Sequence, residues 1–168
     1  MKRTRSYGLR LAAALLGAGA VMLMATLPAL AHGDKHKKAM DAHMQTMLQV
    51  KEQIPEEYRV MDRTPVSPTP QSLARGQELY ARDCAVCHGQ GGKGDGPAAA
   101  AMDPSPANFL DLEHSAIYGP GEKYWLIGNG TGETGMPAFD KLSPTERWDL
   151  VNFILSLQEK TPNKVHGH

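Results

Sequence analysis

The chain has 168 residues, with 18 Lys or Arg, 18 Asp or Glu, and only two cysteines. Residues 1–31 hold four basic side chains and no acidic one, so the remainder has 14 basic and 18 acidic residues and a net charge of about −4. Such a chain offers no basic patch for nucleic acid and no second cysteine pair for a structural zinc ion. Its length fits one small domain beside shorter segments.

Residues 1–31 are predicted to be a secretory signal peptide. A basic start precedes an apolar stretch over residues 11–27, and Ala29-Leu30-Ala31 matches an A-x-A cleavage site. An uncleaved anchor is the alternative, because the apolar stretch approaches the length of a membrane span. Its alanines, its glycines and the cleavage motif favour removal. We therefore expect a protein exported to the periplasm, without a membrane span after cleavage.

Residues 32–69 are predicted to form a His/Met-rich arm and a proline-rich linker. On a helix, spacings of four, three and four residues would align four side chains in one stripe: His36, Met40, His43 and Met47. Imidazoles and thioethers suit copper, and Cu(I) especially where thioethers dominate. A solvated helix or a disordered arm explains the same residues, because a His-rich tract is only compositional evidence.

Residues 70–160 are predicted to form one small all-α domain, followed by a tail over 161–168. Thr69 or Ser72 can cap a first helix that has Pro70 in its opening turn. Gly76 lies in the middle of that helix, where glycine is unfavourable, so we expect a close contact with another helix there.

The remaining elements are also helical in pattern. A turn is expected over 98–102 and a helix over 122–127. Ser143-Pro144-Thr145-Glu146 is a capping box, and the apolar stripe after it predicts a long last helix. No segment alternates with period two for long enough to predict a sheet.

The residues Cys84-Ala85-Val86-Cys87-His88 match C-x-x-C-H, the attachment motif of a c-type haem. On a helical turn both thiols lie on one side and can form thioethers with two haem vinyl groups, while His88 becomes an axial ligand. Zinc binding lacks a second ligand pair, and a thioredoxin-like site lacks its βαβ flanks. We expect one covalently bound haem c, without which so small a core should fold poorly.

Met136 is the predicted ligand on the other face of the iron. A thioether opposite a histidine raises the reduction potential. The glycine-rich segment 128–135 can bring the backbone against a flat cofactor, and Pro137 limits the freedom of the loop. A buried core methionine is the alternative explanation. The competing ligands are Met61, Met102 and His114.

From about residue 73 to 157 the chain resembles a class I monohaem c-type cytochrome. The resemblance rests on features in the family's order: Gly76, Tyr80, the C-x-x-C-H motif, Gly96-Pro97, the segment Gly135-Met136-Pro137-Ala138-Phe139, and Trp148 in the capped last helix. It implies a small cytochrome c fold, in which N- and C-terminal helices cross at near right angles over a covalently bound haem. The arm would lie outside this fold.

The resemblance also implies roles for single residues. His88 and Met136 would be the axial pair, and the carbonyl of Pro97 would accept the Nδ1 proton of His88, which orients the ring. Trp125 would either donate to a haem propionate or pack in the core.

The predicted function is one-electron transfer in the periplasm, because two axial ligands leave iron no open site for a substrate. The protein is then a carrier with redox partner proteins rather than an enzyme. Three alternatives stay open: a haem-bearing subunit of a dehydrogenase or oxidase complex, a haem enzyme or gas sensor with an open sixth site, and a copper-handling protein that uses the arm.

Overall fold

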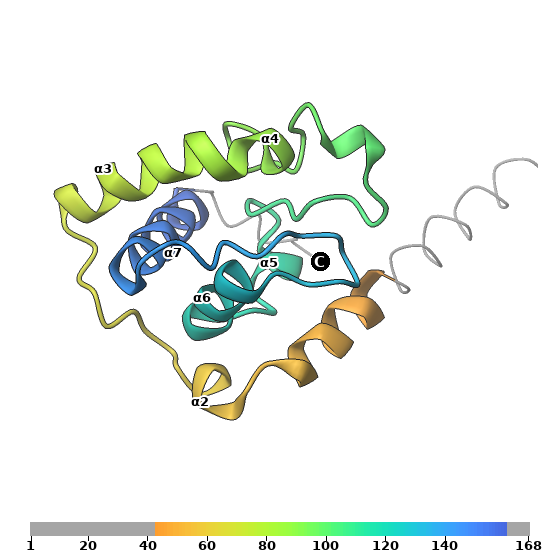
Figure 1. The fold of residues 1–168 in the computed structure, drawn as a ribbon, viewed down its shortest axis with the longest axis horizontal. Helices are drawn as coiled ribbons and strands as arrows, with labels where there is room; N and C mark the ends of the chain where they lie inside the picture. The colour runs from red at the N-terminus through yellow and green to blue at the C-terminus, as the bar shows by residue number, and fades with distance from the viewer. Residues whose placement is uncertain (1–42, 161–168) are drawn as a thin grey trace, which may run out of the picture. The chain divides into compact units, whose positions relative to one another are not determined.

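The computed structural model describes residues 43–160, and nearly all its regular structure is helical (Figure 1). The elements are a helix over 43–53, α2 (Glu56–Arg59), α3 (Pro70–Leu79), a π-helix (Tyr80–Cys84), α4 (Ala85–His88), a 3₁₀-helix (Ala99–Ala101), α5 (Leu112–Ser115), α6 (Pro120–Asn129) and α7 (Pro144–Glu159). An isolated antiparallel bridge joins Thr131 and Met136. The all-α prediction is confirmed.

The predicted signal peptide and the C-terminal tail fall outside the described residues. Between residues 43 and 160, no helix is long and apolar enough to cross a bilayer.

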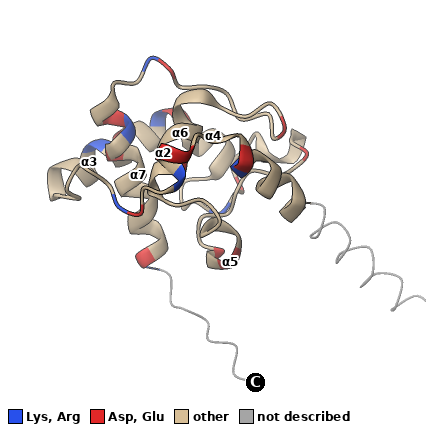
Figure 2. Cartoon of the chain, turned by 90° about the horizontal axis from the view of Figure 1, so that it is seen from below, with Lys and Arg blue, Asp and Glu red and all other residues tan. Residues whose placement is uncertain are grey.

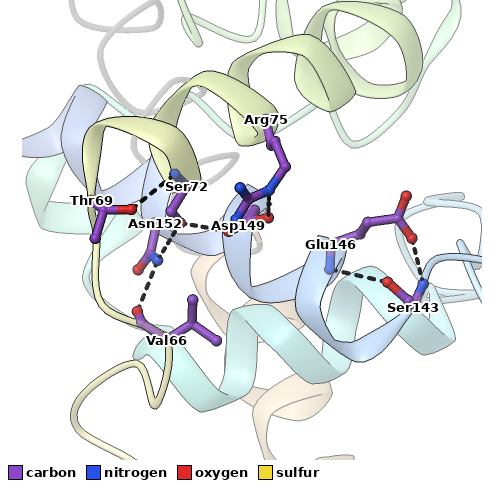
Figure 3. A network of polar contacts seen from close by, with 8 residues as sticks. All are labelled: Val66, Thr69, Ser72, Arg75, Ser143, Glu146, Asp149 and Asn152. Carbon is purple, nitrogen blue, oxygen red and sulfur yellow. Dashed lines mark hydrogen bonds and ion pairs between the residues drawn. The ribbon is translucent and has the colours of Figure 1, made fainter.

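The two longest predicted helices begin at the residues that the sequence indicated (Figure 3). The Thr69 hydroxyl accepts a hydrogen bond from the Ser72 amide at 3.2 Å, so Thr69 is the N-cap of α3. At α7, the Ser143 hydroxyl accepts from the Glu146 amide at 3.3 Å, and the Glu146 carboxylate accepts from the Ser143 amide at 2.8 Å. These bonds satisfy amides that the first turn of a helix leaves unpaired.

Helices α3 and α7 pack directly against each other at Gly76. A Cβ atom there would lie 2.7 Å from the carbonyl carbon of Asp149 and 2.8 Å from the Cβ of Phe153. Only a residue without a side chain permits this approach, so the contact predicted from the sequence is confirmed.

A buried polar network holds the same crossing (Figure 3). The Asp149 side chain is fully buried; it accepts from Arg75 Nε at 2.7 Å and from the Ser72 hydroxyl at 2.5 Å. Asn152 donates to the Ser72 hydroxyl at 3.0 Å and to the carbonyl of Val66 at 2.9 Å. The buried carboxylate is therefore paired on both oxygens, which offsets the cost of removing its charge from water.

The core cluster brings together buried side chains from the π-helix, from α3, α4, α6 and α7, and from the loop before α7. Its members are Leu79, Tyr80, Cys84, Ala85, Ile127, Leu142, Trp148, Leu150, Val151, Phe153 and Ile154. In Figure 1, α3 and α4 run as one rod above α7. The π-helix and α4, which carry the C-x-x-C-H motif, therefore share this core with α3 and α7.

The arm was expected to lie outside the fold, and for its described part this is wrong. Val50 of the 43–53 helix and Ile54, directly after it, are buried with Leu126 of α6 in a second group, the arm cluster, which Tyr58, Tyr118 and Trp125 complete. Lys51 forms an ion pair at 3.0 Å with Glu122, whose side chain is 2% exposed. Apolar burial and one partly buried ion pair thus attach residues 43–61 to α6.

Charged residues are mixed along the described chain. Figure 2 shows Lys and Arg interspersed with Asp and Glu, with no element coloured as uniformly basic.

The close approach at Gly76 predicts a selective loss of stability in Gly76→Ala. The added methyl group meets backbone rather than a movable side chain, so we expect a loss of roughly 1–3 kcal/mol in the free energy of unfolding. Urea denaturation of the haem-loaded protein measures it. Gly91→Ala is the matched control, because nothing lies within 4 Å of the position of its Cβ. Equal stability of the two variants would contradict the helix contact.

Lys123 of α6 predicts a dependence of stability on pH. Its ammonium group donates to the carbonyls of Ser115 and Tyr118, and burial lowers its pKa to about 8 from 10.5. The unfolded chain therefore holds this proton more tightly, so stability rises with pH between those two values. Urea denaturation should show the wild type gaining stability over Lys123→Met across this range. Parallel curves would show that the lysine does not titrate there.

Candidate functional site

The C-x-x-C-H motif lies where α3 continues into the π-helix and α4. The wider π turn ends at Cys84, and the single α turn after it carries Cys87 and His88. Cys84 is buried in the core cluster and Cys87 is half-buried. Burial first, and then the charges of Asp83 and Cys87, raise the pKa of the Cys84 thiol to about 12. A redox-active cysteine needs a lowered pKa, so this environment does not fit thiol–disulfide exchange.

The imidazole of His88 is held in one orientation. Its Nδ1 lies 3.0 Å from the carbonyl oxygen of Ala107, to which the Nδ1–H donates, and the ring stacks on Phe109 with centroids 4.6 Å apart. Burial lowers the pKa of His88, which favours the neutral ring. A neutral imidazole with Nδ1–H bonded to a carbonyl presents Nε2 as its metal-binding nitrogen.

The acceptor for His88 is Ala107 and not Pro97, so that expectation is wrong. The amides on either side of Pro97 bond to α4: Gly96 donates to the carbonyl of Cys87 at 3.1 Å, and Ala98 to that of Val86 at 2.9 Å. Pro97 is therefore held along the backbone of α4. The chain instead returns to the imidazole at residues 106–109, where Phe109 donates to the Gly92 carbonyl at 2.7 Å.

Tyr80 contacts the chain directly after the C-x-x-C-H motif. Its buried hydroxyl donates to the carbonyl of Gly89 at 2.9 Å, and its ring lies 6.4 Å from that of Phe109, edge to face. Burial raises the pKa of this phenol, so it remains a donor. The residue after His88 is thus bonded to the first residue of the π-helix, which ends at Cys84.

Met136 lies in a short loop closed onto the end of α6. Thr131 donates to the Met136 carbonyl at 2.9 Å, and Phe139 donates to the carbonyl of Ile127, also at 2.9 Å. Gly130 has φ +67°, and a Cβ there would lie 2.7 Å from the amide nitrogen of Ala138. The half-buried Met136 side chain packs against the core cluster that contains Cys84. The glycine therefore permits the turn that returns the methionine to the core.

The competing ligands occupy other places. Met61 also packs against the core cluster, but its carbonyl accepts from the Gly121 amide at the start of α6, whereas Met136 follows the end of that helix. These two ends lie about 15 Å apart. Met102 follows the 3₁₀-helix. His114 bonds to Asp111 through Nδ1 at 2.8 Å.

The two aromatic residues of α6 have packing partners within the protein. Trp125 belongs to the arm cluster, and Tyr124 stacks on Trp148 with ring centroids 4.3 Å apart. For Trp125, this supports the core-packing alternative.

The sequence did not indicate Ala107 and Phe109 as partners of His88. Ala107 acts through its backbone carbonyl, and because every residue has one, the residue type does not indicate this role. Phe109 carried a weak signal, as an isolated aromatic residue after the Pro104-Ser105-Pro106 break.

The donor set of the site fits a covalently attached haem. The C-x-x-C-H turn combines two thiols with an imidazole oriented through Nδ1, and a thioether packs against the same apolar core. Thiols at this spacing can form thioethers, and an imidazole nitrogen and a thioether sulfur are both axial ligands of haem iron.

Comparison with known proteins gives the family. The family model for cytochrome c matches residues 73–158, just over half of the chain. A chain of the reducing HAO-like protein complex of Kuenenia stuttgartiensis is similar at 32% identity and a TM-score of 0.49, over 55% of this chain and 46% of that one. This chain therefore spans less than half the length of that relative. No curated protein sequence matches.

A covalently bound c-type haem and haem-based electron transfer follow from the family match, which starts three residues into α3 and ends one residue before the end of α7. The chain belongs to the cytochrome c family.

Proposed function

We propose that the protein is a periplasmic one-electron carrier with a single haem c. Cys84 and Cys87 form the two thioether bonds, and His88 and Met136 are the axial ligands. The protein exchanges electrons with redox partner proteins and is not itself an enzyme.

One observation carries this proposal: the Ala107 carbonyl fixes the orientation of the His88 imidazole at 3.0 Å, and burial lowers the pKa of this ring, which favours its neutral form. A ligand that is already oriented through Nδ1 needs no rearrangement to bind iron through Nε2. The half-buried thioether of Met136, packed against the same core cluster as Cys84, supports its assignment as the opposite ligand.

The residues around the site favour electron transfer over substrate chemistry. When bound, the haem supplies an iron that exchanges one electron between its ferric and ferrous states. His88 and Met136 would hold the iron from its two faces, so no open position would remain for oxygen and other small ligands. The packed core resists a change of shape, so the ligand geometry stays similar in the two oxidation states.

Export rests on the sequence of residues 1–31. The A-x-A motif supports cleavage after Ala31, which leaves His32 as the first mature residue. Removal of four basic residues leaves an acidic protein, which suits docking to basic surfaces on its partners.

Met136→Ala is expected to open the sixth coordination position. The ferric spectrum should lose the methionine–iron charge-transfer band, the reduced protein should bind carbon monoxide, and the reduction potential should fall, because the thioether no longer stabilises ferrous iron. Absorption spectroscopy and redox titration measure these changes. Met102→Leu is the matched control and should leave all three unchanged.

Two results would contradict the carrier proposal. An unchanged low-spin spectrum in Met136→Ala would show that another residue is the ligand. A high-spin ferric spectrum in the wild type would show an open site, as in a haem enzyme or a gas sensor.

Replacing both Cys84 and Cys87 by serine is expected to abolish covalent attachment. A serine hydroxyl does not form the thioether, so haem should be extracted from the denatured double variant by acidified organic solvent. The wild type should retain it. Haem that stays with the denatured variant would disprove attachment through these cysteines.

A further inference from the structure

Two histidines from separate parts of the chain lie close together, one in the arm and one in α5. His43 lies in the first described turn of the 43–53 helix and His114 lies in α5, and their ring centroids are 6.2 Å apart at an interplanar angle of 48°. When two imidazoles bind the same metal ion, each with a metal–nitrogen distance of about 2 Å, their ring centroids lie roughly 5–6.5 Å apart. The observed separation falls within that range.

Asp111 holds His114 in the way that carboxylates hold metal-binding histidines. Its Oδ2 lies 2.8 Å from Nδ1 of His114, whose side chain is only 17% exposed. A carboxylate on Nδ1 fixes the ring and makes its other nitrogen a stronger ligand. Asp111 also caps α5, since its Oδ1 accepts from the His114 amide at 3.4 Å.

Met47 adds a thioether on the face of the arm helix that carries His43. The two residues are four apart, so their side chains are neighbours on the helix surface. Met47 is 5% exposed, and the Tyr118 hydroxyl donates to its carbonyl at 2.7 Å. This bond ties the Met47 turn to the segment that follows α5. With 5% of its surface exposed, the Met47 side chain is buried in the protein rather than exposed to solvent.

We propose that His43, Met47 and His114 form a Cu(I) site, with Asp111 as a positioning residue. Two imidazoles and one thioether are a soft, neutral donor set, which suits a monovalent copper ion. Over residues 43–160, no three or more His, Cys, Asp or Glu side chains are grouped to hold a metal, so a zinc site of that kind is not formed there.

This site differs from the stripe expected from the sequence. The expected ligands all lay on the arm, and two of them, His36 and Met40, fall outside the described residues. Docking of the arm instead brings His114 of the haem domain beside His43, four residues before Met47 on the same helix. Because none of the three ligands is assigned to the haem, the copper site can fail without affecting the proposed electron transfer, and the reverse also holds.

Anaerobic titration tests the site in the mature, haem-loaded protein. Cu(I) is presented with a chromophoric Cu(I) chelator, and competition gives the affinity of the tightest-bound equivalent. Replacing one ligand at a time, in His43→Ala, His114→Ala and Met47→Leu, should weaken that affinity at least about tenfold. His166→Ala and Met102→Leu are the matched controls and should bind as the wild type does.

The variant Asp111→Asn tests whether Asp111 positions His114 for Cu(I) binding or only caps α5. Asparagine caps a helix as well as aspartate does, so α5 should persist, while loss of the carboxylate should weaken Cu(I) binding about tenfold. Copper X-ray absorption of the wild type should show nitrogen and sulfur scatterers together, and Met47→Leu should remove the sulfur. The haem spectrum of each variant verifies folding.

Several outcomes would overturn the proposal. One is a wild type that does not compete for Cu(I). Another is unchanged affinity in folded His43→Ala and His114→Ala, which would place any bound copper elsewhere. Preference for Zn²⁺ over Cu(I) in the same competition would refute the assigned metal.

Discussion

The contact between α3 and α7 at Gly76 determines where the reactive residues lie. The π-helix and α4 continue α3 without a break, so whatever fixes α3 also fixes Cys84, Cys87 and His88. Backbone contact at Gly76 sets the separation of the helices, and the buried carboxylate of Asp149, bonded to α3, sets their register. A polar group buried among apolar side chains tolerates few alternative arrangements, because a shift would leave it unpaired.

Two loops, together with the α3–α7 crossing, position the residues of the haem site. Residues 106–109 supply the carbonyl and the aromatic ring that orient His88, and the loop after α6 returns Met136 to the core. Neither loop contains a helix, and the loop after α6 has only the isolated bridge between Thr131 and Met136. Backbone hydrogen bonds to α6 or to the residues after His88 hold each loop in place. A flat, apolar cofactor suits such a frame, because rigid helices position one ligand while a braced loop presents another.

Features with local causes were predictable from the sequence. The caps at Thr69 and Ser143, the proline in each first turn and the close contact at Gly76 all follow from residue type and neighbours. The acceptor for His88 was not predictable, because any backbone carbonyl can serve and chain geometry selects it. The pairing of Lys51 with Glu122 joins residues 71 positions apart, and no local pattern marks it.

The arm shows how a segment outside the family match becomes part of the domain. The match begins at residue 73, yet Val50 and Ile54 are as buried as the central residues of α7. Successive turns of the 43–53 helix place His43 beside His114, bond Met47 to Tyr118 and bond Lys51 to Ile117 and Glu122. Since one helix makes all these contacts, the apolar burial and ion pair that dock it also set the spacing of the two imidazoles. Binding of a metal there and docking of the arm would therefore stabilise each other, because a ligand that binds only the docked state favours that state.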